Sequence, residues 1–499
     1  MRRGALLTVA LLQLGAGCLL GPGPAQARGS LHVSDVPLSG RARQVGIVMW
    51  QERPAIWAFV TQPSGDALLH VFVMRGQSIQ QVALWPLPWA TAWVQPMARR
   101  GAHPVWLAHI AAQWRLGSMA DGALAWRPAC ACANPYPARD EPGEAARFVY
   151  DLNGDGTDEV LLPEAGAVAA YALDSADGEL RLLWRDTWRT ELRSEQRGGQ
   201  RREFLELPRY TVNDINGDGT GDLVVQEATQ LAVTTHPPAA AWLVPGGAPP
   251  DNALAPAAVP LPGIGRLADN SFAEVLAQED VNRDGVPDVV HYTVSNLDSV
   301  LSQKSVLRWF AGSRQGGAYA LHEQRPTYRT DGPGFALLER AGVAPGSAPV
   351  LYLATADTSF AATARALSSG LISLTIGVHP WRGPRPVRQP VAEVTLDFSA
   401  RREGGAPPTI LAVDLDGDGW REAVLNPKAG QVRVYRGTPQ GPALDRDPMA
   451  EGDFRLPQRR ERNLIGELNG QPGEEWVLWF RDKDLTDAER SRIQLVRLN

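Results

Sequence analysis

A nine-residue acidic motif occurs four times in this chain of 499 residues, each time between two short apolar runs. The copies begin at Asp151, Asp214, Asp280 and Asp414. Positions one, three and five carry Asp or Asn, position six is glycine and position nine is a carboxylate. Apolar, β-rich runs on both sides of an Asp/Asn/Gly-rich segment are typical of two strands joined by a turn. The motif therefore predicts a strand, an acidic loop and a second strand in each copy.

The spacing of these oxygen-bearing side chains suits a hard cation. Ca²⁺ takes roughly six to eight oxygen ligands, whereas Mg²⁺ demands a stricter octahedron. Alternate positions of a tight loop can point inward, and the carbonyl of position seven and the carboxylate of position nine complete the set. We predict up to four calcium sites, with these ligands: Asp151, Asn153, Asp155, Thr157 and Glu159; Asp214, Asn216, Asp218, Thr220 and Asp222; Asp280, Asn282, Asp284, Val286 and Asp288; Asp414, Asp416, Asp418, Trp420 and Glu422.

Two other interpretations of the motif are weaker. An EF-hand requires a Glu at position twelve, where this chain has Leu162, Val225, His291 and Leu425. Asp, Asn and Gly also favour ordinary turns, but chance turns do not explain four copies in one register. Arg283 and Arg421 lie inside two of the loops, and we expect them to lower the affinity there.

The spacing of the copies predicts the architecture. Successive loops start 63, 66 and 134 residues apart, and the double gap holds a degenerate copy at 341–353. Another eroded copy lies at 467–479, and acid-free relatives lie near 104–107 and 55–58. Such units contain short strands and no clear helix, and they bury their faces only by stacking. We predict an all-β fold, a β-propeller of about seven or eight four-stranded blades, closed by pairing of 493–498 with the first strands near 44–50.

The loops resemble those of FG-GAP and VCBS repeat proteins, including the calcium loops of integrin α-subunits. The resemblance implies a propeller of about seven blades over 45–499, with calcium at the positions given above. The phrase that names the family is only hinted at, in Gly246, Gly247, Ala248 and Pro249.

The amino terminus predicts export. Arg2 and Arg3 precede an apolar segment at 5–12, and a small-x-small cleavage site lies at 25–27. An alternative is a lipoprotein signal that ends before Cys18, which would anchor the protein to a membrane. The product is then periplasmic or secreted, or lipid-anchored at the envelope. The expected segments are a signal peptide (1–27), a lead-in (28–44) and the propeller (45–499).

The remaining features concern cysteine, tryptophan and charge. In an oxidising compartment Cys130 and Cys132 are expected to pair as a local disulfide, with redox or copper chemistry as the alternative. Eight of the sixteen tryptophans lie between Trp50 and Trp126, either as a stacking surface for a ligand or, as we favour, as filling between blades. The basic stretch 185–202 alternates with acids and predicts a solvated hairpin or insertion. Scattered basic residues and a net charge of −6 argue against nucleic acid.

No catalytic motif of the common hydrolase, metalloprotease or P-loop types occurs in the sequence. We therefore expect a non-enzymatic binding or adhesion module for protein or glycan. The alternative is a carbohydrate-active enzyme, a polysaccharide lyase or hydrolase, which Asp, Glu, His or Arg clustered in the central funnel away from calcium would favour. A structural envelope component is the second alternative.

Overall fold

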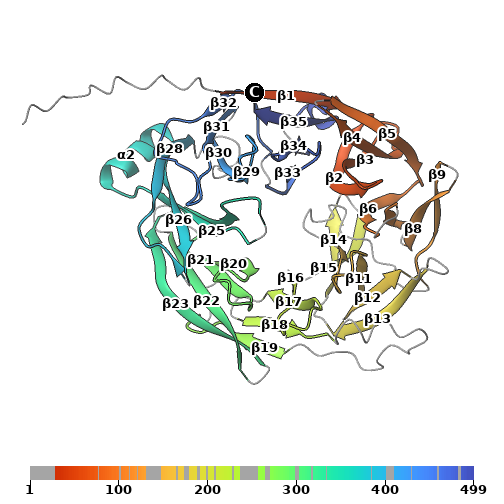
Figure 1. Ribbon diagram of the computed structural model, residues 1–499, viewed down its shortest axis with the longest axis horizontal. Helices are drawn as coiled ribbons and strands as arrows, with labels where there is room; N and C mark the ends of the chain where they lie inside the picture. The colour runs from red at the N-terminus through yellow and green to blue at the C-terminus, as the bar shows by residue number, and fades with distance from the viewer. Residues whose placement is uncertain are drawn as a thin grey trace, which may run out of the picture.

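Eight β-sheet blades surround a central opening in the computed structural model of the chain (Figure 1). The eight are counted over the described residues, which are 29–498 except 77, 100–102, 112, 121, 131–147, 165–166, 174–178, 188–190, 198–199, 207–209, 227–229, 237–256, 265–269, 298–302, 316–317, 333, 345, 384, 400–408, 429, 458–459 and 482–484. The predicted all-β propeller is confirmed, with eight blades in this part of the chain.

The first four blades follow one another along the chain, and within each the strands pair antiparallel in sequence order. Their strands are β2 (Arg41–Trp50), β3 (Arg53–Thr61), β4 (Ala67–Arg75) and β5 (Ser78–Leu87); β6 (Thr91–Met97), β7 (Val105–Ile110), β8 (Gln113–Ala120) and β9 (Ala123–Pro128); β10 (Val149–Tyr150), β11 (Glu159–Glu164), β12 (Ala167–Leu173) and β13 (Leu180–Thr187); β16 (Tyr210–Asn213), β17 (Asp222–Gln226), β18 (Gln230–Thr234) and β19 (Ala257–Pro260).

The last four blades complete the ring. Their strands are β20 (Phe272–Glu279), β21 (Asp288–Ser295), β22 (Lys304–Gln315) and β23 (Ala318–Asp331); β24 (Gly334–Arg340), β25 (Pro349–Ala356), β26 (Leu371–Arg382), β27 (Arg385–Pro386) and β28 (Ala392–Ser399); β29 (Ile410–Val413), β30 (Glu422–Lys428), β31 (Gln431–Tyr435) and β32 (Ala450–Gly452); β33 (Asn463–Gly466), β34 (Glu475–Trp479) and β35 (Arg492–Leu498), joined by β1 (Gly29–Pro37).

Ring closure uses a different strand from the one the sequence predicts. β1 pairs antiparallel with β35, from Leu31 opposite Leu498 to Pro37 opposite Arg492. The predicted partner, 44–50, instead lies in β2 and forms a hairpin with β3. The expectation was wrong because only two residues separate β2 from β3, so a local hairpin forms in preference to the distant pairing. Part of the expected lead-in is therefore a strand of the propeller.

The core lies between neighbouring blades. The second strand of a blade is packed on both faces, so β3, β7, β11, β25 and β34 are nearly continuous runs of buried residues. Trp93, Trp106, Trp184 and Trp476 are among the largest fully buried side chains, which confirms tryptophan as filling between blades. Among the described tryptophans, Trp89 is the exposed one, with 85% of its surface accessible.

Four local elements depart from the plain repeat. The helix α2 (Phe360–Ser369) lies between β25 and β26 and was not expected; the Ser359 side chain caps its first turn and Gly370 ends it at φ 72°. A short α3 (Asp487–Arg490) connects β34 to β35 within blade eight, and a 3₁₀ turn (Arg460–Arg462) directly precedes β33. β14 (Glu191–Arg197) and β15 (Gln200–Glu206) form a hairpin that overlaps the predicted stretch 185–202, whose first three residues belong instead to β13. Among the described residues, none of the helices has the length and apolarity needed to cross a membrane.

Candidate metal sites

The four acidic loops occupy the same place in four blades. Each connects the first strand to the second, at 151–158, 214–221, 280–287 and 414–421. The eroded copies at 341–348 and 467–474 make the same eight-residue connection in the sixth and eighth blades. Because the first strands of all blades run in the same direction along the central opening, these connections lie on one face of the ring. The prediction that each acidic loop connects two neighbouring strands of a repeat unit is confirmed.

The position-one carboxylate organises each loop. In the first loop the N–H groups of Asp155 and Gly156 donate to the two oxygens of Asp151 at 3.1 and 3.0 Å. Asp214 and Asp280 accept from the same two positions in their loops. Asp414 accepts from Gly417 and Gly419 at 2.9 and 3.0 Å. The four loops therefore share nearly the same frame of hydrogen bonds.

Positions three and five continue this frame. Asn153 accepts from the Asp155 N–H at 2.9 Å, and Asp155 accepts from the Thr157 N–H at 2.7 Å. The equivalent bonds in the other loops involve the position-three residues Asn216, Asn282 and Asp416, the position-five residues Asp218, Asp284 and Asp418, and the position-seven residues Thr220, Val286 and Trp420. Side-chain oxygens at alternate positions thus gather inside each loop, where carboxylate and amide oxygens have further lone pairs for a cation.

Glycine at position six is required by the backbone. Gly156, Gly219, Gly285 and Gly419 have φ between 83° and 89°, a region that favours glycine. Position four also has positive φ, and three loops place glycine there. The third loop has Arg283, at φ 66°.

The position-nine carboxylates are buried at the start of the second strand. Glu159, Asp222, Asp288 and Glu422 each accept the N–H of position two, at 2.7 to 3.1 Å. Burial raises the pKa of Glu159 to about 8, of Glu422 to about 7 and of Asp288 to about 6. A buried carboxylate of raised pKa favours a neutral form or a nearby positive charge, and a cation in the loop would supply that charge.

The fourth loop has the strongest convergence of ligands. Asp414, Asp416 and Glu422 each bring a carboxylate oxygen within 4.8 Å of the others, the one such group of three in the described part of the chain. In the other three loops position three is Asn, whose amide oxygen is also a calcium ligand. The donor sets of all four loops therefore fit a hard cation.

Neighbouring loops support the fourth one. The Glu474 N–H donates to the Asp414 carbonyl at 2.6 Å, and the Arg421 N–H donates to the Ala341 carbonyl at 2.8 Å. The Arg421 guanidinium lies 2.6 Å from the Glu474 carboxylate. Both flanking loops are eroded copies, so they keep a structural role after losing their acids.

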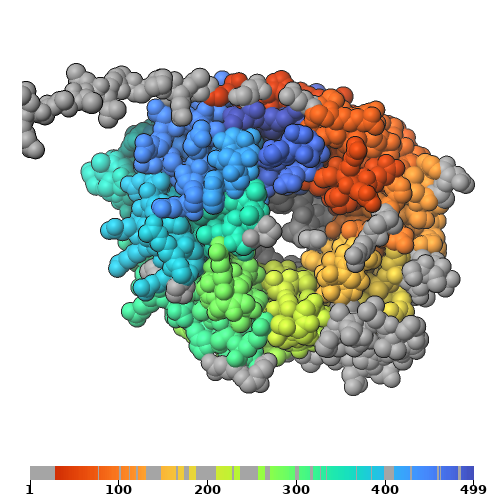
Figure 2. Space-filling model, in the orientation of Figure 1, coloured from red at the N-terminus to blue at the C-terminus, as the bar shows by residue number. Residues whose placement is uncertain are grey.

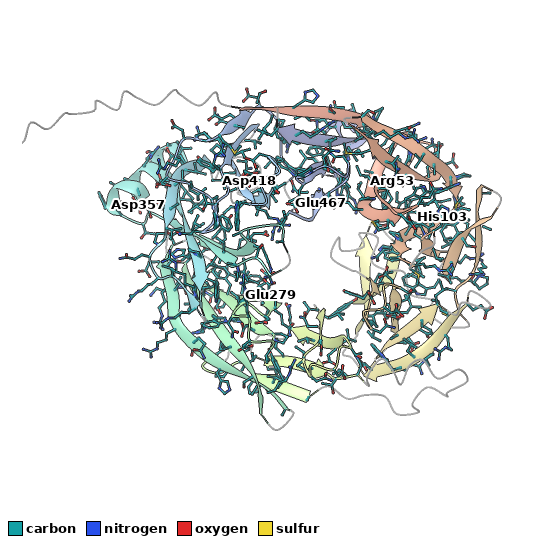
Figure 3. All side chains as sticks on the ribbon, viewed as in Figure 1. Arg53, His103, Glu279, Asp357, Asp418 and Glu467 are labelled. Atoms are coloured by element: carbon teal, nitrogen blue, oxygen red, sulfur yellow. The ribbon has the colours of Figure 1, made fainter. Side chains whose placement is uncertain are left out.

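Ion pairs at the inner strands join residues that are far apart in the sequence. Glu279 pairs with Arg340, and Glu339 pairs with Arg460. Figure 3 places Glu279 and Glu467 beside the central opening and Asp357 on the outer rim. No short sequence motif contains these pairs, because each joins residues of different blades.

Other predicted residues lie partly outside the described chain. Cys130 is disulfide-bonded, while Cys132 lies outside the described residues. The signal segment 1–27, with Cys18, also lies outside them, as does the hinted family phrase at 246–249.

No protein-family model and no curated protein matches the chain. Among solved structures, a lectin of Agrocybe aegerita that recognises terminal N-acetylglucosamine is 12% identical, with a TM-score of 0.38 over 83% of this chain and 89% of that one. Saccharomyces cerevisiae Sqt1 is 10% identical, with a TM-score of 0.40 over 93% and 97%. The Vibrio cholerae biofilm matrix protein Bap1 is 11% identical, with a TM-score of 0.29 over 95% and 88%. At these TM-scores the likenesses carry no argument about ligand or activity.

Proposed function

We propose that this protein is an exported, calcium-binding β-propeller of the FG-GAP/VCBS type that acts as a non-enzymatic binding or adhesion module for protein or glycan. The observation that supports calcium binding is the set of backbone-to-side-chain hydrogen bonds that the four loops share. Nearly the same hydrogen bonds recur in each loop, and in the fourth Asp414, Asp416 and Glu422 converge. Export, and a membrane anchor if Cys18 is lipidated, are part of the proposal and rest on the amino-terminal sequence.

Calcium would act here chiefly through stability. Bound to the folded loops, it neutralises carboxylates that otherwise repel one another. With a Kd near ~0.1 mM, in the weak extracellular range, and ~1 mM free calcium, each site contributes about 1.4 kcal/mol. Four filled sites contribute roughly 5–6 kcal/mol, comparable to the net stability of a small domain.

A carbohydrate-active enzyme is the second candidate. The observation that favours it is a pair of inner-strand acids that are outside the predicted calcium-ligand sets: Glu279 directly precedes the third acidic loop, and Glu339 precedes the eroded copy at 341–348. Each of these two acids is paired with an arginine, an arrangement that suits ligand recognition as well as catalysis. Turnover of acidic or neutral polysaccharides by the purified protein, lost in Glu339→Gln, would favour this candidate over the first.

The test of the calcium part is a direct count of bound metal. Isothermal titration of the chelated protein with Ca²⁺, checked by elemental analysis after dialysis, is expected to give up to four sites. Asp414→Asn is expected to remove one of them, and Asp445→Asn, which changes an exposed acid outside the loops, is expected to remove none. Absence of bound calcium at millimolar concentration would refute the proposal.

A further inference from the structure

A cavity of about 430 Å³ opens on the wall of the central opening, beside the fourth acidic loop. The first strands of three consecutive blades line it: Glu339 of β24, Leu411 of β29, and Asn463 and Ile465 of β33. Arg421 and Arg460 complete its polar lining. Figure 2 shows an opening at the centre of the ring, and the strands that line the cavity are inner strands of their blades. Its volume lies within the range of about 300–1,000 Å³ for small-molecule sites.

The charge of the lining differs from that of the protein. Two guanidinium groups and one carboxylate line the cavity, whereas the whole chain carries −6. The Glu474 carboxylate, which is not part of the lining, balances Arg421. The N–H groups of the two guanidinium groups at the lining can donate to an anionic ligand. The planar N–H fork of arginine matches a carboxylate in particular.

Both arginines are held in place by acids. Arg421 donates from Nε and Nη2 to Glu474 at 3.1 and 2.6 Å, which uses two of its five N–H groups. Its side chain keeps 23% of its surface exposed. Arg460 is paired with Glu339 and is 48% exposed. The guanidinium groups are thus oriented before a ligand arrives, which lowers the entropic cost of binding.

The rest of the lining suits a polyhydroxylated ligand. Ile465 is the half-buried apolar residue of the lining and can contact the C–H face of a sugar ring, whereas Leu411 and Ala412 are buried in the core. The Glu339 carboxylate can accept a hydroxyl hydrogen. We propose that this cavity binds a small ligand with one carboxylate and several hydroxyl groups, the chemistry of a uronic acid. This names the ligand class of the binding module proposed above and rests on that proposal.

The experiment is isothermal titration of the calcium-loaded full chain with D-glucuronate, D-glucose and acetate. We expect glucuronate to bind, and glucose and acetate to bind at least about tenfold more weakly, because each lacks half of the recognised groups. Arg460→Gln is expected to weaken glucuronate binding by about tenfold or more. Arg446→Gln, which changes an 81% exposed arginine elsewhere, is the matched control and is expected to leave binding unchanged.

Several results would overturn the assignment. They are no glucuronate binding at millimolar concentration, equal binding by Arg460→Gln, or acetate or glucose binding as tightly as glucuronate. A melting curve for each variant shows whether it folds, and Arg421→Gln provides a second, independent change of the lining. Calcium counted in the same samples separates the two proposals, since bound calcium without glucuronate binding refutes only the cavity assignment.

Discussion

The first two blades and the four blades with acidic loops build the same architecture from different interactions. In blade one a turn of two residues, Gln51 and Glu52, joins the first two strands, whereas the later loops need eight. In place of acids, blades one and two pack aromatic rings against each other, such as Trp57 against Trp106 and Trp93 against Trp114. Aromatic packing is complete once the chain folds, but the acidic loops concentrate negative charge and need a positive partner. We infer that the two regions respond to different solution conditions.

Removal of calcium is expected to have the largest effect. Chelation removes roughly 5–6 kcal/mol if four sites are filled. Hydrogen exchange in EDTA should therefore speed up at 151–158, 214–221, 280–287 and 414–421 before it speeds up in β3 and β7. Uniform acceleration around the ring would contradict the contrast between the regions.

Trp106→Ala is expected to cost about 3–5 kcal/mol, because it empties a fully buried site between the first two blades. The loss should be the same with and without calcium, as measured by chemical denaturation. Trp89→Ala is the control: its side chain is exposed, and its change in stability should stay within about 0.5 kcal/mol. A calcium-dependent loss in Trp106→Ala would show that the two regions are coupled.

Asp155→Ala is expected to abolish the first site and cost about 1.4 kcal/mol in millimolar calcium, with little effect in EDTA. Thermal melting under both conditions measures the difference. Gln471→Ala makes the equivalent change at position five of an eroded loop and should behave alike in the two buffers. Equal losses for Asp155→Ala in calcium and in EDTA would mean that Asp155 only shapes the turn.

Acid is expected to weaken the first blades. Burial lowers the pKa of His109 to about 4, so below its usual value of 6.5 the unfolded chain binds the proton more readily. Stability should fall as pH drops from 6.5 towards 4, by about 1 kcal/mol at pH 5.5. His109→Gln should flatten the dependence of stability on pH between 6.5 and 4.

The raised pKa values of Glu159 and Glu422 give the opposite dependence in calcium-free protein. Their contribution to the free energy of unfolding is present at low pH and is lost as pH rises through about 7–8.

Arg283→Gly is expected to give the smallest effect, a change in stability below about 1 kcal/mol. Glycine removes the backbone strain that Arg283 has at its positive φ, but it also increases the conformational entropy of the unfolded chain, and the two effects oppose each other. Calcium titration of the variant should show tighter binding in the third loop, because the substitution removes the positively charged Arg283 side chain from that loop. Unchanged affinity would mean that Arg283 points away from the ligands.

The features that could be predicted from the sequence are those that depend on residues close together in the chain. Loop phase, the glycine at position six and the two eroded copies are encoded within a few residues, and so were found. Closure by β1 was missed because its partner lies more than 450 residues away and its own alternation is typical of any edge strand. The pair of Glu339 with Arg460 was missed for a similar reason, since it exists only once the ring is formed. Ser359 is a typical N-cap residue at the start of α2, but the helix was not predicted because the surrounding sequence follows the repeat of short strands.

Pairing of β1 with β35 brings both ends of the folded chain to one point on the circumference. A lipid, linker or fused domain attached to either end would therefore hold the disc by its edge. Both flat sides would then stay accessible to solvent and to other molecules at the same time.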